Sequence, residues 1–362
     1  MAAFPLPALA ASLALSALAA PLFSVGLSPI DDSGMSVHEQ SAKACASCHP
    51  NQAAEWRHSR HGVAFTNAIF QREYREEPLD WCVHCHAPLK SQLAEVKRGG
   101  GPLASEGVTC AVCHVRAGQI LARRKNPSSP HQTQVLPDFG SASFCAGCHQ
   151  FNFPLFGADK QVTGYSKFPM QNTVAQFKTG PHQSGRCGDC HGRSPFGHAF
   201  PGAHDTSMLR SALRYSLCRQ GSTVRVTLHN EGAGHNVPSG DVHRHIQVRL
   251  WRSSSPERLY EYSLTRRYEP VAGGGKRTVL DTTIPSGATR ILSVPLAQLG
   301  PALPTAEPLN FELRYVYTID EFPFRRNELP EPTYESFASA RLLPDELALC
   351  PTAGADRTVR SP

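Results

Sequence analysis

One short motif, Cys-x-x-Cys-His, recurs five times in this chain and constrains what it can fold into. The copies begin at Cys45, Cys82, Cys110, Cys145 and Cys187, and they use ten of the twelve cysteines. Their spacing is irregular, so the chain repeats a kind of site rather than the structural unit of a solenoid. The chemistry that needs two thiols and a histidine in this order therefore limits both the cofactor and the fold.

Three kinds of chemistry use two cysteines separated by two residues. A structural zinc site takes four ligands, usually from two such pairs, and five pairs leave one over. A redox-active disulfide normally occurs once, in a βαβ unit. Neither explains a histidine after every second cysteine. Covalent haem does, because both thiols form thioethers with the porphyrin and the histidine ligates its iron.

The motifs therefore predict five covalently bound haem c groups. The predicted attachment residues are Cys45, Cys48, Cys82, Cys85, Cys110, Cys113, Cys145, Cys148, Cys187 and Cys190. The predicted proximal iron ligands are His49, His86, His114, His149 and His191. About 29 residues per haem cannot build a conventional core, so the porphyrins must supply much of the apolar interior and lie close together.

The formal net charge of +6 has to be considered together with the cofactors. Haem propionates are anionic, so five haems offset most or all of the excess. We therefore expect no nucleic-acid partner. We expect redox partner proteins, a membrane-bound electron-transfer complex among them, and leave the oligomeric state open. Arg116, Arg123, Arg124 and Lys125 are either propionate partners, a docking patch or a solvated charge run.

The N-terminal residues 1–26 are apolar and rich in alanine and leucine. Ala17-Leu18-Ala19 fits a cleavage site, so residues 1–19 are predicted to be a signal peptide and residues 20–44 a leader. Because no Lys or Arg precedes Lys43, an uncleaved anchor is the alternative. Either reading predicts a periplasmic or other extracytoplasmic protein.

The chain changes character near residue 216. Residues 45–215 predict a mostly helical and irregular pentahaem domain, in which Trp56, Val63 and Phe70 indicate a helix within residues 51–77. Residues 216–350 contain short alternating runs between Gly and Pro turns, which predict an antiparallel β-sandwich-like domain. Residues 351–362 are a tail, and the fold class is α+β.

Cys218 and Cys350 bracket the strand-rich half and belong to no motif. In an oxidising compartment they could form a disulfide, which would close a long loop and contribute on the order of 4–5 kcal/mol. The alternative is two buried thiols.

Twelve histidines remain for the distal side of the five irons. A second histidine closes an iron for electron transfer, whereas an open position allows ligand binding and catalysis. The number of histidines does not decide between closed and open irons.

Five segments carry a resemblance to a known group of proteins: "WRHSRHGVAF", "GVTCAVCH", "FCAGCHQF", "GPHQSGRCGDCH" and "GHAFPGAHD". Over residues 40–215 the chain resembles multihaem c-type cytochromes related to cytochrome c-554 and hydroxylamine oxidoreductase. The resemblance implies these distal iron ligands: His61, His131, His182, His198 and His204. His38, His58 and His235 are weaker candidates for distal ligands.

Other residues with ligating atoms have more ordinary interpretations. His84 sits between two tethered cysteines, where solvent or propionate contact is expected, and Met170 is expected to pack as an ordinary thioether. The loop over residues 230–245 is interpreted as a connecting loop. The alternatives are a haem ligand at His235 and a metal site at His243 and His245.

The favoured hypothesis is an exported cytochrome that carries electrons along a chain of haems, with no catalytic residues. The first alternative is an oxidoreductase acting on a small nitrogen or sulfur compound at one five-coordinate haem. The second alternative is a subunit of a larger haem-based electron-transfer assembly.

Overall fold

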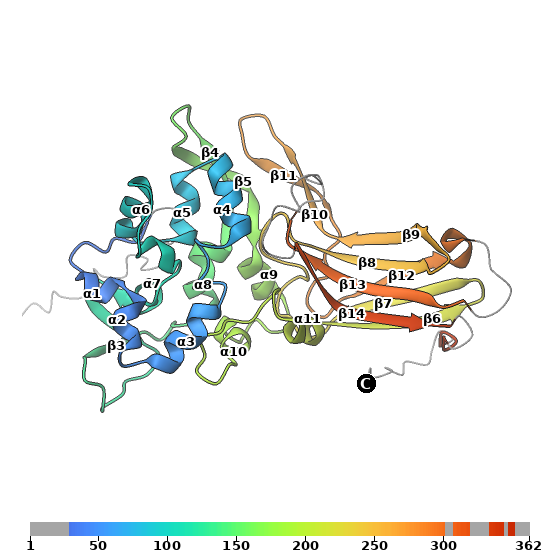
Figure 1. The fold of residues 1–362 in the computed structure, drawn as a ribbon, viewed down its shortest axis with the longest axis horizontal. Helices are drawn as coiled ribbons and strands as arrows, with labels where there is room; N and C mark the ends of the chain where they lie inside the picture. The colour runs from blue at the N-terminus through green and yellow to red at the C-terminus, as the bar shows by residue number, and fades with distance from the viewer. Residues whose placement is uncertain (1–28, 301–306, 319–332, 344–346, 352–362) are drawn as a thin grey trace, which may run out of the picture.

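The computed structural model describes residues 29–300, 307–318, 333–343 and 347–351, with the backbone alone at residues 37 and 38. The predicted signal peptide, residues 20–28 of the predicted leader and nearly all of the tail lie outside these residues. Figure 1 shows an elongated molecule with short helices at one end and long strands at the other. This mixture of helix and antiparallel sheet agrees with the α+β class. Within the described ranges, no helix is long and apolar enough to cross a membrane.

The helical end is built from short helices joined by turns. The helices are α1 Val37–Gln40, α2 Ala42–Ala46, α3 Pro50–His58, α4 Ala68–Glu76, α5 Asp80–His86, α6 Lys90–Lys97, α7 Cys110–His114, α8 Ala142–His149, α9 Thr173–Thr179, α10 Cys187–His191 and α11 Thr206–Ala212, with a 3₁₀ turn η1 at Ala104–Glu106. Four motifs lie on helices that end at the motif histidine: α5, α7, α8 and α10. The first motif runs from α2 to His49, the residue before Pro50 at the start of α3.

The stretch over residues 51–77 forms two helices, α3 and α4, instead of the single predicted one. The first ends where the Ser59 hydroxyl donates to the carbonyl of Trp56 at 2.7 Å. Gly62 then packs so close to the same carbonyl that a Cβ there would lie 2.3 Å from its oxygen. The turn that follows carries His61 away from the helix surface on which His58 remains exposed.

The helical end also contains strands that the sequence pattern does not indicate. They are β1 Val115–Arg116, β2 Gln119–Ala122, β3 Thr133–Val135, β4 Gln150–Phe156 and β5 Val162–Asn172. β2 pairs in parallel with β3, and β4 pairs with β5 as a hairpin. Phe153 of this hairpin packs against Tyr268, with 5.3 Å between ring centroids, and so joins the two ends of the molecule.

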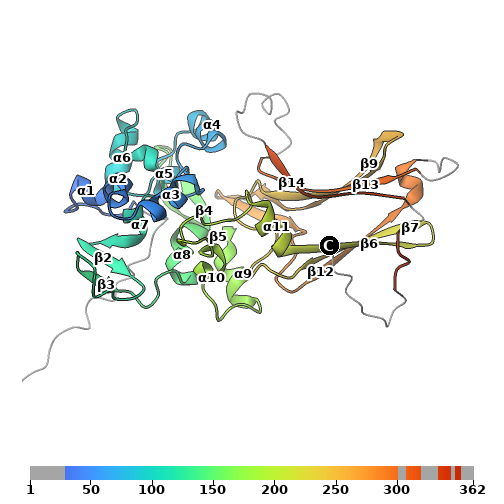
Figure 2. The ribbon, with the colours of Figure 1, turned by 60° about the horizontal axis from the view of Figure 1, so that its bottom comes forward.

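The strand-rich end consists of two facing antiparallel sheets and one hairpin (Figure 2). Its strands are β6 Leu213–Gln220, β7 Thr223–Asn230, β8 His245–Arg252, β9 Ser255–Leu264, β10 Arg266–Pro270, β11 Lys276–Asp281, β12 Thr289–Pro295, β13 Leu309–Val316 and β14 Tyr334–Leu342, with a 3₁₀ turn η2 at Leu296–Leu299. The sheet orders are β12-β7-β6 and β14-β13-β8-β9, and β10 pairs with β11.

One apolar core lies between these sheets. Alternate residues of β7, such as Val226 and Leu228, are fully buried against residues of the other sheet, such as Val248 and Leu313. This alternation is the pattern that predicts strands here. Because β6 begins at Leu213, the predicted boundary at residue 216 falls inside a strand.

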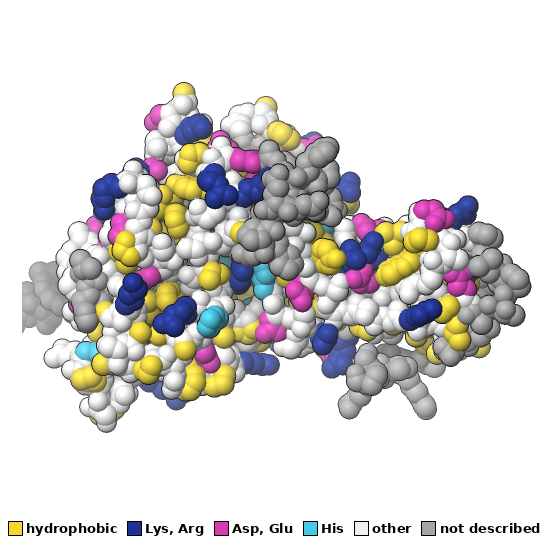
Figure 3. Space-filling model, in the orientation of Figure 1, with side chains coloured by type: hydrophobic (Ala, Val, Ile, Leu, Met, Phe, Trp, Pro, Cys, Tyr) yellow, Lys and Arg dark blue, Asp and Glu magenta, His cyan; other side chains and the backbone are white. Residues whose placement is uncertain are grey.

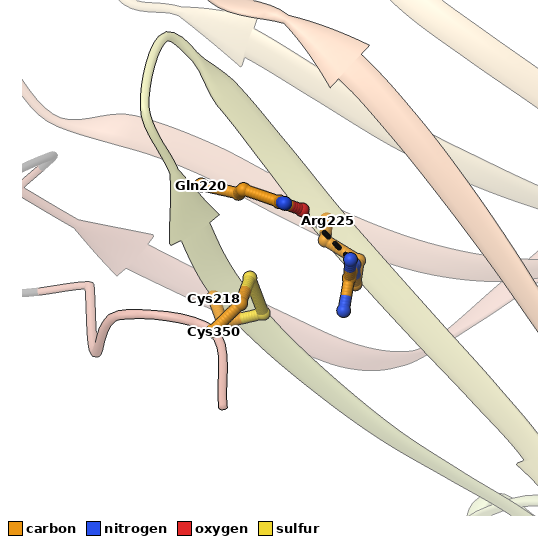
Figure 4. Close-up of a disulfide and its surroundings, with 4 residues drawn as sticks. All are labelled: Cys218, Gln220, Arg225 and Cys350. Carbon is orange, nitrogen blue, oxygen red and sulfur yellow. Dashed lines mark hydrogen bonds between the residues drawn. A yellow bond between two sulfur atoms is a disulfide. The ribbon is translucent and has the colours of Figure 1, made fainter. Parts of the chain in front are cut away.

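Cys218 of β6 and Cys350 of the C-terminal segment form a disulfide (Figure 4). The segment also lies along β6, because the Cys350 amide donates to the Arg219 carbonyl at 2.9 Å. The disulfide thus attaches the end of the chain to the edge of the three-stranded sheet, next to a hydrogen bond between Gln220 and Arg225.

Candidate haem sites

Each motif presents its reactive groups on one side because of helix geometry. Residues i, i+3 and i+4 of a helical turn share a face, so the two thiols and the imidazole of a Cys-x-x-Cys-His motif project together. None of the ten motif cysteines forms a disulfide, and Cys48 is the exposed one among them. Among the described residues, no group of three or more His, Cys, Asp and Glu side chains is arranged to hold a metal ion.

Thiols of different motifs lie close enough together to shift one another's pKa values. The Cys110 thiol donates to Cys45 and lowers the pKa of Cys45 to about 7. In the same way, the Cys145 thiol lowers the pKa of Cys187 to about 7. The pKa of Cys148 is raised because its thiol donates to Cys85. These contacts bring the first motif beside the third, the fourth beside the fifth, and the second beside the fourth.

Four motif histidines each face a second histidine at nearly the same distance. The ring centroids are 6.2 Å apart for His49 and His131, 6.4 Å for His61 and His149, 6.1 Å for His114 and His198, and 6.3 Å for His191 and His235. A metal–imidazole bond of about 2.0–2.1 Å, plus about 1.1 Å from Nε2 to the ring centre, gives roughly 6.2–6.4 Å for two imidazoles on opposite sides of one metal. The residues present therefore fit a haem iron between the members of each pair.

Backbone carbonyls fix the orientation of several of these rings. A carbonyl oxygen can only accept, so each contacting Nδ1 carries the proton and leaves Nε2 for a metal. The contacts are His86 with Ala64 (2.7 Å), His114 with Leu121 (3.0 Å), His191 with Pro201 (2.6 Å), His198 with Phe196 (2.6 Å) and His235 with Asn236 (2.9 Å). Burial lowers the pKa of His61 to about 4 and lowers the pKa of His114 and His235, which favours the neutral, metal-binding imidazole.

The second motif differs from the other four. Within the part of the chain that the structure describes, no histidine ring lies opposite His86 at a comparable distance; Phe70 instead stacks on the flank of its ring at 3.7 Å. Burial is the main reason why the pKa values of His86 and His204 are lowered. The positive charges of Arg60 and Arg244 also lower both pKa values. These residues therefore surround one site at the junction of the helical and strand-rich ends.

Two buried nitrogen atoms beside this site have no hydrogen-bond partner: Nε2 of His204 and Nη1 of Arg244. The His204 ring stacks on Tyr317 at 3.9 Å, and the Arg244 guanidinium lies 5.0 Å from the centre of the same tyrosine ring. Buried polar atoms normally have a hydrogen-bond partner. These unpartnered nitrogen atoms therefore fit a site that accommodates a polar or anionic group.

The structure brings together some of the candidate distal ligands and not others. His61, His131, His198 and His235 each face a motif histidine. His182 is exposed in the turn after α9, and His235, not His182, lies opposite His191. His58 is exposed on α3, and the side chain of His38 lies outside the described residues.

The remaining candidates occupy ordinary structural positions. Met170 is half-buried on β5, and the Nδ1 of His245 lies 3.1 Å from the backbone carbonyl of His243. Arg116 donates to backbone carbonyls of α7 and β1, whereas Arg123, Arg124 and Lys125 are exposed in the segment after β2. On the face shown in Figure 3, Lys and Arg side chains are spread over both ends of the molecule among acidic and apolar ones.

Comparison with known proteins agrees with this chemistry. Residues 44–115 match the family model described as "Cytochrome c554 and c-prime". A penta-heme cytochrome c552 from Thermochromatium tepidum has a similar fold, with a TM-score of 0.65 and 18% sequence identity over 84% of this chain and 99% of that one. No curated protein matches.

The motifs, the fold and the match over residues 44–115 support a multihaem c-type cytochrome, in agreement with the resemblance that its motifs carry. They also support haem-based electron transfer as its role and haem c as its cofactor.

Proposed function

We propose that the protein is an exported pentahaem cytochrome that carries electrons along five covalently bound haems, one at each Cys-x-x-Cys-His motif. The observation that carries the proposal is the set of four imidazole pairs, with ring centroids 6.1–6.4 Å apart. A haem whose iron is ligated by two histidines would supply reversible one-electron chemistry without binding substrate. The chain's own residues hold the imidazoles, supply the thiols and fix the ring tautomers.

The proposed order of the sites in space is first, third, fourth and fifth, with the second beside the fourth. The thiol contacts Cys45–Cys110 and Cys145–Cys187 support the two ends of this line. The neighbourhood of the third and fourth sites is supported by Cys113 of the third motif. Burial raises the pKa of the Cys113 thiol to about 11, and Cys148 of the fourth motif also raises it. The branch rests on the contact between Cys85 and Cys148.

The two ends of this line differ in exposure. At the first site, Cys48, His49 and His131 are all exposed, so a redox partner could approach it directly. The fifth site faces His235, which belongs to the loop between β7 and β8, and the second lies near Arg244 of the same loop. Partner proteins, including a membrane-bound complex or a larger haem assembly, would therefore exchange electrons at the first site.

Intact mass, a pyridine haemochrome assay and electron paramagnetic resonance (EPR) of the ferric holoprotein test this function. We expect five haems on ten modified cysteines and at least four low-spin irons. A protein with fewer than four haems, or with most irons high-spin, would contradict a conducting chain of closed sites.

A second candidate function is small-ligand binding at the second site, as expected of an oxidoreductase acting on a nitrogen or sulfur compound. One observation favours this second function. Among the described histidines, none has a ring that faces His86 as closely as the rings of the other four pairs face each other. His204 and Arg244 border the site with nitrogen atoms that lack partners.

The spin state of the second iron separates the two candidates. Ligand binding predicts one high-spin ferric signal that cyanide or nitrite abolishes, in the wild type and in His204→Ala alike. If all five irons are low-spin and His204→Ala creates the high-spin signal, His204 is the sixth ligand and the site serves electron transfer alone.

A further inference from the structure

Phe200 has an unusual backbone conformation for a bulky side chain. Its φ is +45°, and Ala117 and Lys160 are the other non-glycine residues with positive φ in the described chain. An aromatic residue seldom adopts this region, because its Cβ collides with the backbone, so other contacts must hold it there.

The Phe200 ring touches the ligand histidines of two different sites. Its centroid lies 4.8 Å from that of His61 and 6.0 Å from that of His198, with edge-to-face geometry in both contacts. His61 faces His149 of the fourth motif, and His198 faces His114 of the third. One phenyl ring therefore contacts the ligand sets of two neighbouring sites.

The backbone on both sides of Phe200 contacts ligand histidines as well. The carbonyl of Pro201 accepts a hydrogen bond from Nδ1 of His191, the histidine of the fifth motif, at 2.6 Å. The carbonyl of Phe196 accepts one from Nδ1 of His198, also at 2.6 Å. The segment Ser194–Pro201 thus touches ligands of the third, fourth and fifth sites.

A single carboxylate anchors this segment. Glu55 of α3 accepts hydrogen bonds from the Ser194 hydroxyl at 2.8 Å, the Phe196 amide at 3.1 Å and the His198 amide at 2.9 Å. These bonds lower the pKa of Glu55 against the opposing effect of burial. The ionised carboxylate can hold the loop against the strain at Phe200, because bonds to a charged acceptor are the stronger kind.

We propose that Phe200 is a positioning residue that orients the imidazoles of His61 and His198, and thereby links the redox properties of the third and fourth haem sites. The inference rests on the proposed electron-transfer function. An aromatic edge set against a ring restricts rotation of that ring in a way that an aliphatic side chain does not. A side chain that only filled space would be replaceable by leucine.

The test compares Phe200→Leu, which keeps bulk but removes the aromatic edge, with Phe200→Tyr, which keeps both. Phe153→Leu is the matched control, because Phe153 is buried and makes its edge-to-face contact with Tyr268 rather than with a ligand histidine. Each holoprotein is first checked for an unchanged haem number by intact mass. Its ferric EPR spectrum and potentiometric titration are then recorded.

The g values of a low-spin haem depend on the relative orientation of its two axial imidazoles. We expect Phe200→Leu to shift two low-spin signals and the midpoint potentials of two haems, while Phe200→Tyr and Phe153→Leu retain the wild-type spectrum. Wild-type signals in Phe200→Leu would overturn the inference, as would equal shifts in Phe153→Leu. If the leucine variant loses haem, Phe200→Tyr and Phe200→Trp are compared with the wild type instead, and altered signals in both would also overturn the inference. Failure of the wild type to show low-spin haems would instead defeat the proposed function itself.

Discussion

His235 lies opposite His191 with their ring planes only 4° apart, although the two residues come from opposite ends of the molecule. His191 ends α10 in the helical end, and His235 belongs to the loop between β7 and β8. The strand-rich end therefore contributes one member of the imidazole pair on which the proposed fifth haem site rests, which would give it a role beyond covering the helical end.

Replacing His235 should open one iron. We expect His235→Ala to convert one low-spin signal to high-spin while haem number stays constant, because one of two axial imidazoles is lost. EPR at matched haem content measures this. His182→Ala is the control, since His182 is exposed and faces no motif histidine. The opposite pattern, with His182→Ala creating the high-spin signal, would contradict the observed pairing.

The first site should respond to a change of ligand type at His131. A methionine in place of one histidine raises the reduction potential of a haem. We therefore expect His131→Met to raise one midpoint potential in a spectroelectrochemical titration and to leave the other four within error. His58→Met, at an exposed position on α3, should leave all potentials unchanged. A shift in several potentials would show that His131 acts on more than the first site.

The disulfide should stabilise the strand-rich end without affecting the haems. It joins residues 132 apart in sequence. Closing a loop of this size contributes on the order of 4–5 kcal/mol in the chain-entropy model. We expect the double variant Cys218→Ala/Cys350→Ala to lower the melting temperature of the β-sheet signal in circular dichroism, with EPR and haem content intact. Equal melting temperatures for both proteins would mean that the bond contributes little.

Glu312 should make the strand-rich end sensitive to acid. Its carboxylate is almost fully buried on β13, where it pairs with Arg249 at 2.9 Å and Arg314 at 2.7 Å and accepts from Ser336 at 2.5 Å. Hydrogen bonds from Arg314, Ser336 and Arg249 lower its pKa despite the opposing effect of burial. A lowered folded-state pKa gives stability that is present above the unfolded pKa and lost as pH falls through the folded one.

We therefore expect Glu312→Gln to destabilise the strand-rich end by roughly 1–3 kcal/mol at neutral pH and by less below about pH 4. Thermal unfolding followed by circular dichroism at several pH values measures the difference. Glu269→Gln on the exposed β10–β11 hairpin is the control, because its ion pair with Arg277 is open to solvent. If the stability difference between the wild type and Glu312→Gln became larger at acidic pH, this prediction would be contradicted.

Local chemistry is the reason the candidate covalent sites can be named from the sequence, and their occupation by five haems stays a prediction. A motif of five residues fixes both thiols and the proximal imidazole on one helical turn, so no long-range information is needed. The strands β7, β8 and β13 were also predictable, because apolar and polar residues alternate along their sequences. By contrast, β4 and β5 contain Pro154 and Pro169 and irregular pairing, and no clean alternation marks them.

The distal histidines depend on contacts between distant parts of the chain. Resemblance to known cytochromes pointed to His61, His131 and His198, all within the helical end. It also pointed to His182, which precedes the fifth motif in sequence but turns to the surface. His235 is a weaker candidate from sequence because its Gly-rich loop resembles an ordinary connection, and only the packing of the two ends brings it to His191.

The contacts between thiols of different motifs bear on how the protein can be assembled. Cys45 lies beside Cys110, Cys145 beside Cys187 and Cys85 beside Cys148, so under the proposed function each of these pairs joins sulfurs that belong to separate haems. Sulfurs this close cross-link readily once oxidised. If the chain folded in an oxidising compartment before it received its porphyrins, disulfides would form between cysteines of different motifs. Under the proposed function, the porphyrins would therefore have to be attached to a reduced chain before tertiary packing is complete.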